Sequence, residues 1–118
     1  MEIYFGGRGN GKTYKAIQLS EEKQMPIVCW NSHQLEEIKH IAYKKGIRIP
    51  EPILAENVRK KVIGNRRGLI IDDLDILLRR IFDDNVYYAT MEDCNIWKLD
   101  DLLEKGAEEW KLMRSLVK

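Results

Sequence analysis

Short apolar runs alternate with longer segments of helical periodicity along this chain. The runs are continuous and rich in strand-forming residues, and they comprise Ile3-Tyr4-Phe5, Ile27-Val28-Cys29-Trp30 and Leu69-Ile70-Ile71. Between them, apolar residues recur three and four positions apart, which is typical of amphipathic helices. Buried strands that alternate with helices predict an α/β fold with a small parallel sheet and helices on both faces.

Capping residues and breakers set the limits of the first two helices. The first is expected from Gly11 to Glu22. Asn31 and Ser32 favour the start of the second, and Gly46 is expected at its C′ position.

The second half of the chain gives four further elements. Leu54, Val58 and Val62 lie four apart and predict a helix over 52–63. Leu74 to Phe82 predicts a helix that leaves the third strand, followed by a turn at 83–85. Val86 to Thr90 is rich in strand-forming residues and predicts a fourth strand, and the apolar stripe of 99–118 predicts a final helix.

Composition restricts the class of protein. A chain of 118 residues with net charge +1 predicts a single domain over 1–118 without a global field for nucleic acid. Two distant cysteines, Cys29 and Cys94, predict reduced thiols in a cytoplasmic protein. No run is long enough to span a membrane, and Met1 lies so close to the first strand that no targeting segment is expected. His33 and His40 are expected to face solvent rather than bind a metal.

The stretch between the first strand and the first helix has the pattern Gly-x-x-x-x-Gly-Lys-Thr. It consists of Gly6, Gly7, Arg8, Gly9, Asn10, Gly11, Lys12 and Thr13, with Tyr14 following. Glycines between a strand and a helix start let backbone N–H groups surround a polyphosphate, so this is the phosphate-binding P-loop pattern. Lys12 is expected to reach the β- and γ-phosphates and Thr13 to bind Mg²⁺. The alternative is a glycine-rich turn with a chance Lys-Thr pair.

A second motif ends the third strand. The apolar run Leu69 to Ile71 leads into Asp72 and Asp73, as in a central parallel strand that places a carboxylate at the sheet edge. Downstream of a P-loop, Asp72 is expected to hold Mg²⁺ as the Walker B acid. The alternative is a plain core strand.

Together these motifs resemble the P-loop NTPases over most of the chain. The Gly-Gly-Arg-Gly stretch is similar to the P-loops of phage terminase large subunits. The run Leu69 to Leu74 is similar to the Walker B motif of AAA+ replication initiators and helicase loaders. Both belong to the class with an additional strand between the two motif strands. The resemblance implies a three-layer fold with sheet order first, fourth, third, second strand.

The resemblance also assigns roles to single residues. It implies that Asp73 polarises the attacking water and that Thr90, after the fourth strand, senses the γ-phosphate. It implies ATP or GTP with Mg²⁺ as ligands. The chain departs from both families: a segment before the first strand, a nuclease domain, an AAA+ lid and a fifth strand are not found in the sequence. The expectation is a minimal domain of the kind encoded by phages and mobile elements.

Three functions remain open at this stage. The first is an ATPase that works on nucleic acid or an assembly, with a basic cluster for phosphates made of Arg59, Lys60, Lys61, Arg66 and Arg67. That cluster is equally explained as a solvated helix end. The second is a nucleotide-binding regulator with little turnover, and the third is a small-molecule kinase.

Without a fifth strand, Ile3 to Phe5 is expected to form a sheet edge. Exposed edges favour pairing with another chain. The sequence therefore predicts a homo-oligomer or a protein partner near this strand. In such an assembly Arg8, or an arginine of the basic cluster, is expected to stabilise the γ-phosphate.

Overall fold

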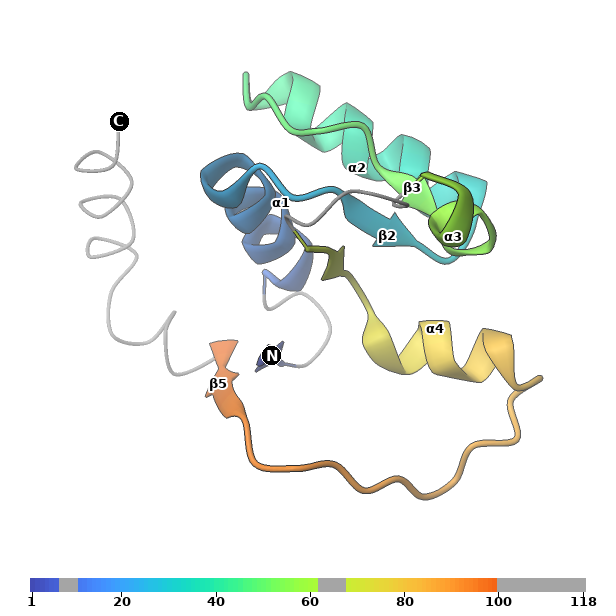
Figure 1. Ribbon diagram of the computed structural model, residues 1–118. Helices are drawn as coiled ribbons and strands as arrows, with labels where there is room; N and C mark the ends of the chain where they lie inside the picture. Colours follow the sequence, from blue (N-terminus) through green and yellow to red (C-terminus); the bar gives the residue numbers. More distant parts are fainter. Residues whose placement is uncertain (7–10, 62–67, 100–118) are drawn as a thin grey trace. The chain divides into compact units, whose positions relative to one another are not determined.

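The computed structural model describes residues 1–6, 11–61 and 68–99 as a mixture of helices and short parallel strands (Figure 1). The chain divides into two compact units, Met1–Lys12 with Thr90–Lys118, and Thr13–Ala89. Each unit contains its own parallel strand pairing. The α/β class expected from the sequence is therefore confirmed at this level.

In the first unit, β1 (Glu2–Phe5) pairs in parallel with β5 (Asn95–Lys98). The register places Ile3 opposite Ile96 and Tyr4 opposite Trp97. The first predicted strand is confirmed. The paired residues are more than ninety positions apart in sequence, so most of the chain lies between the two strands.

The second unit is built on a parallel sheet with β2 (Ile27–Cys29) at its centre. It lies between β3 (Ile53–Leu54) and β4 (Ile70–Ile71). All three residues of β2 are buried, as expected for a central strand covered on both faces. The second and third predicted strands are confirmed and are neighbours.

Three helices begin and end within about one residue of the limits that the sequence predicts. They are α1 (Lys12–Lys23), α2 (Ser32–Lys44) and α4 (Leu74–Ile81). The Asn31 side chain accepts a hydrogen bond from the Gln34 N–H at 2.8 Å and so caps α2. Gly46 has a φ of +66° just past the end of α2, a conformation that favours glycine.

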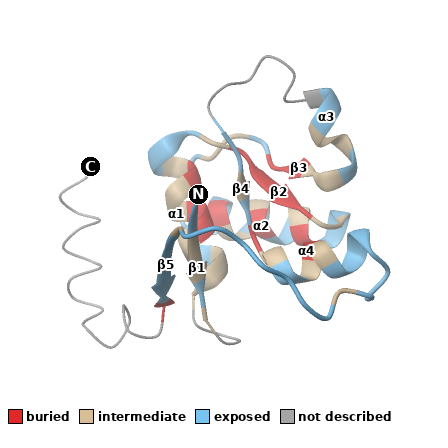
Figure 2. Ribbon diagram, turned by 60° about the horizontal axis from the view of Figure 1, so that its bottom comes forward, coloured by how far each residue is buried: buried red, intermediate tan, exposed pale blue. Residues whose placement is uncertain are grey.

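The core of this unit joins α1, β2 and α2. Figure 2 shows buried residues gathered on these elements. They are Ala16, Ile17, Ile27, Cys29, Ile38, Ala42 and Ile47. Both helices therefore pack their apolar sides toward the central strand. This packing determines the positions of the first turns of α1 and α2 at the edge of the sheet.

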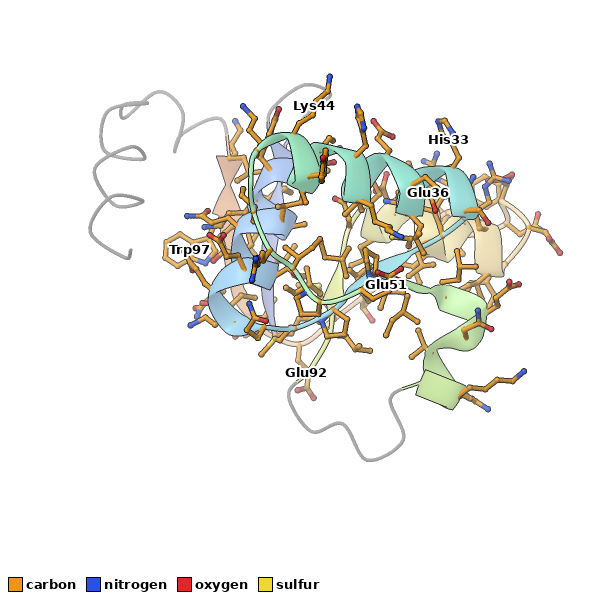
Figure 3. The ribbon with its side chains drawn as sticks, turned by 90° about the horizontal axis from the view of Figure 1, so that it is seen from above. His33, Glu36, Lys44, Glu51, Glu92 and Trp97 are labelled. Atoms are coloured by element: carbon orange, nitrogen blue, oxygen red, sulfur yellow. The ribbon has the colours of Figure 1, made fainter. Side chains whose placement is uncertain are left out.

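The outer side of α2 is polar and exposed. His33 and His40 are both exposed, as expected, and His33 is labelled with Glu36 and Lys44 in Figure 3. Lys39 binds Glu51 across 3.1 Å. Within residues 1–6, 11–61 and 68–99, no helix is long and apolar enough to cross a membrane.

The helix predicted over 52–63 is wrong at its start. Residues 53 and 54 form β3, followed by a 3₁₀ turn at Ala55–Asn57 and the short helix α3 (Val58–Lys61). The four-residue apolar spacing suggested a helix, but Ile53 pairs with Val28 and is buried. Tertiary pairing therefore overrides the local pattern. Residues 62 and 63 lie outside the described part.

The fourth strand predicted at 86–90 is also wrong. Residues 85–94 form no strand, and the Tyr87 and Tyr88 side chains are 79% and 96% exposed. Strand propensity mostly reflects packing against a partner, and this run has none in the described chain. The strand that pairs with β1 comes later, at 95–98. The expectation that no fifth strand exists is wrong as well, because β3 and β5 were both missed. The final helix expected over 99–118 lies outside the described residues from 100 onward.

Core and surface substitutions should differ sharply. Ile17 is fully buried, so Ile17→Ala should lower the free energy of unfolding by about 2–5 kcal/mol. Tyr88→Ala should change it by less than about 0.5 kcal/mol. Urea denaturation measures both. A large loss for Tyr88→Ala would mean that residues 86–90 are paired after all.

Candidate functional site

The first turn of α1 carries two of the residues singled out by the sequence. Gly11 has a φ of +81°, and the chain then enters α1 at Lys12 and Thr13. A residue with a side chain is strained at that φ, so glycine is required immediately before the helix. Within an α-helix the first four N–H groups have no partner inside the helix, and its N-terminus is the positive end of the helix dipole. Gly7, Arg8, Gly9 and Asn10 lie outside the described residues, whereas Gly6 follows β1.

Thr13 meets the acid of the second motif. Its hydroxyl donates a hydrogen bond of 3.1 Å to Oδ2 of Asp72. The two residues are 59 positions apart in sequence. Asp72 is only 4% exposed, so this carboxylate is inside the protein rather than on a solvated strand end. The structure thus brings together the two residues that the sequence predicts as ligands of one metal ion.

The sheet explains why these residues meet. In the parallel pair β2 and β4, Val28 lies opposite Ile71, so the following residues leave the sheet at the same edge. The carboxyl ends of parallel strands are the usual place for ligand sites in α/β proteins. Asp72 follows β4 there, and the start of α2 follows β2. From α2, the Gln34 side chain donates from Nε2 to the same oxygen of Asp72 at 3.4 Å.

The buried carboxylate perturbs its surroundings. Burial, together with the negative charge of Asp72, raises the pKa of the Cys29 thiol from 9.0 to about 12. Cys29 is fully buried in β2, beside the position of Asp72. It therefore stays a neutral thiol at ordinary pH, which agrees with the reduced core thiol expected from the sequence.

The chemistry of Thr13 and Asp72 fits magnesium. Both offer oxygen, the ligand that this hard cation prefers, and Mg²⁺ usually takes only one or two protein ligands plus phosphate and water. Within the described residues, no group of three His, Cys, Asp or Glu side chains forms a complete metal site.

Asp73 has a different setting from its neighbour. It occupies the N-cap position of α4 with φ 57° and ψ 58°, in the left-handed region, and its side chain makes no capping hydrogen bond. An N-cap residue normally has an extended backbone and caps the helix with its side chain. The backbone of Asp73 is therefore uncommon for a residue other than glycine.

The contacts around Asp72 do not include the other residues that the sequence predicts for the site. Thr90 ends no strand, since residues 85–94 form none, so the reason for expecting a γ-phosphate sensor there no longer holds. Tyr14 is 46% exposed, and the Lys45 ammonium lies 5.5 Å from its ring centre. Of the basic cluster, Arg59 and Lys60 are exposed on α3, and Arg66 and Arg67 lie outside the described residues together with the side chain of Lys61.

Sequence reasoning missed Gln34 and the effect of Asp72 on Cys29. A glutamine three residues after the capping Asn31 reads as an ordinary polar residue of the first helical turn. Its burial, at 6% exposure, was the missing information. No spacing rule in a single sequence would have identified it.

Comparisons with protein-family models, with curated proteins and with solved structures found no match to this chain. The functional proposal therefore depends on the chemistry of the described residues.

The raised pKa of Cys29 predicts an alkaline loss of stability. The folded state holds the thiol proton up to about pH 12, whereas the unfolded chain releases it near 9.0. The stabilisation is fully present below pH 9 and is lost as pH rises toward 12, with a slope approaching about 1.4 kcal/mol per pH unit. Urea denaturation across this range should give a smaller slope for Cys29→Ala. Equal slopes in both proteins would contradict the assignment.

Proposed function

We propose that this protein binds a nucleoside triphosphate with Mg²⁺ and hydrolyses it, with ATP as the leading candidate over GTP. The observation that carries the proposal is the hydrogen bond between Thr13 and the buried Asp72. A Gly-Lys-Thr sequence at a helix start, taken alone, only suggests phosphate binding. A buried carboxylate, taken alone, only costs free energy of folding. Their meeting at the carboxyl edge of a parallel sheet is what a phosphate-bound Mg²⁺ requires.

Each residue then has a defined task. The backbone N–H groups around Gly11 and the start of α1 bind phosphate oxygens, and the Lys12 ammonium neutralises the β- and γ-phosphates. Thr13 and Asp72 hold the metal ion. When bound, Mg²⁺ would polarise the phosphate oxygens and offset charge that develops on them.

Asp73 is proposed as the residue that orients the attacking water. It follows Asp72 directly, between the end of β4 and the start of α4. Left-handed backbone at a residue other than glycine costs free energy and is often found at functional sites. In hydrolysis the water oxygen attacks the γ-phosphorus, the bond to the β,γ-bridging oxygen breaks, and a proton of the water passes to a base or to the phosphate.

The finer fold assignment belongs to the same proposal. We propose a three-layer P-loop fold with the sheet order first, fourth, third, second strand. The support is the chain order: β5 follows β4 and α4 and pairs in parallel with β1. In the additional-strand class, the strand after the Walker B strand lies beside the P-loop strand. In this proposal β5 is the fourth strand, which was expected at 86–90.

The process served is proposed as a nucleic-acid or assembly step of the phage type. Arg59 and Lys60 on α3 are exposed and can contact phosphates without reading sequence. Turnover measured with and without DNA tests this part separately. Stimulation by DNA supports it, and equal rates would contradict it while leaving the nucleotide site intact.

Nucleotide binding should stabilise the folded state. ATP or GTP with Mg²⁺ at about a hundred times its dissociation constant should add about 2.7 kcal/mol, because it binds only the folded protein. Lys12→Ala should abolish the thermal shift, since it removes the main positive charge on the phosphates. Lys23→Ala, at the exposed far end of α1, is the matched control and should keep it. A parent protein that shows no shift with any nucleotide would refute the proposal.

Substitutions of Asp72 and Asp73 should affect different properties of the protein. Asp73→Asn should keep Mg²⁺-dependent nucleotide binding and lose turnover by about a hundredfold or more, as when a group that assists proton transfer is removed. Asp72→Asn should weaken the Mg²⁺-dependent binding itself. Asp75→Asn, exposed on the first turn of α4, should behave like the parent. Phosphate release and calorimetry separate the two effects, and parental turnover in Asp73→Asn would sink the assignment.

A further inference from the structure

Gln34 connects the end of β2 with the buried carboxylate. It is the third residue of α2 and is 6% exposed. Its Oε1 accepts a hydrogen bond of 2.7 Å from the backbone N–H of Trp30, and its Nε2 donates to Oδ2 of Asp72 at 3.4 Å. Both ends of one amide are therefore engaged inside the protein.

The orientation of this amide is fixed by chemistry. A backbone N–H can only donate, so the group facing Trp30 must be the amide oxygen. The NH₂ group is then turned toward Asp72, where it meets an acceptor. The backbone N–H of Gln34 is also held, by the Oδ1 of Asn31 at 2.8 Å, so the side chain starts from a fixed helical turn.

The same oxygen of Asp72 receives the Thr13 hydroxyl at 3.1 Å. Donors from α1 and α2 thus converge on one carboxylate oxygen. Because Asp72 is 4% exposed, such donors replace the water that a carboxylate would otherwise bind. Partners that hydrogen-bond to a metal ligand orient it and commonly change metal affinity about 10–100-fold when removed.

We propose that Gln34 is a positioning residue for Mg²⁺: it holds the Asp72 carboxylate in the orientation that binds the ion. This inference rests on the proposed nucleotide and Mg²⁺ site. Gln34 acts through Asp72 and does not itself contact the ion or the nucleotide. A purely structural glutamine, which only ties α2 to the end of β2, would affect folding and every ligand alike.

The test is the Mg²⁺ concentration that gives half-maximal Mg²⁺-dependent nucleotide binding, measured by calorimetry with ATP. Gln34→Met keeps the length of the side chain and leaves a weak sulfur acceptor for Trp30, but it removes the donor to Asp72. The midpoint should rise about tenfold or more. Nucleotide binding in EDTA, which relies on Lys12 and the backbone, should stay at the parental level.

Gln18→Met is the matched control. Gln18 lies on α1, and its Oε1 is buried without a hydrogen-bond partner among the described residues, so the same chemical change is made away from Asp72. Its midpoint should equal that of the parent. An unchanged midpoint in Gln34→Met, or equal losses with Mg²⁺ and with EDTA, would overturn the inference while the nucleotide site stands. A parent that binds no nucleotide would instead refute the proposed function.

A double-mutant cycle shows whether Gln34 acts through Asp72. In an Asp72→Asn background, Gln34→Met should cause no further rise in the Mg²⁺ midpoint, and full additivity would contradict the coupling.

If Gln34→Met does not fold, the proposal can be tested by NMR on the parent protein. The side-chain NH₂ resonances of Gln34, assigned through bonds from its own backbone, should shift when Mg²⁺ is added to the nucleotide-bound protein. Resonances that stay in place would overturn the proposal.

Discussion

A buried carboxylate must be held by hydrogen-bond donors, and that requirement organises the candidate site. Asp72 is inside the second unit, where a charge without partners would cost several kcal/mol. Thr13 and Gln34 supply donors to it from the first turns of α1 and α2. Both helices are in turn positioned by the core that they share with β2. The hydrogen bonds at Asp72 therefore depend on the packing of this unit, and the proposed metal site depends on the hydrogen bonds.

The parts that sequence predicted are those with a strong local cause. Continuous apolar runs gave β1, β2 and β4, and the Asn31 and Gly46 caps gave the limits of α2. The contact between Thr13 and Asp72 could be expected, because the two motifs that contain these residues both predict a ligand of the same Mg²⁺ ion. The described contact between them is the strongest support for reading Gly6 to Thr13 as more than a glycine-rich turn.

The parts that sequence missed depend on tertiary partners. The sequence pattern at Ile53 and Leu54 resembles the start of an amphipathic helix. These residues nevertheless form a strand, because they pair with β2. Val86 to Thr90 has better strand composition than Asn95 to Lys98, but the later segment is the one that pairs with β1. The importance of Gln34 arises only from its burial between Trp30 and Asp72. Local propensity cannot report any of these facts, because each is a choice between partners that are distant in sequence.

The central claim is that Thr13 and Asp72 jointly hold a phosphate-bound divalent ion. The most direct measurement is a crystal structure with a non-hydrolysable ATP analogue and Mn²⁺ in place of Mg²⁺, in which anomalous scattering locates the ion. The account predicts one peak beside the β- and γ-phosphates, bound to the Thr13 hydroxyl and facing Asp72 directly or through water. An ion located away from both residues, or phosphates bound elsewhere than at the start of α1, would contradict it.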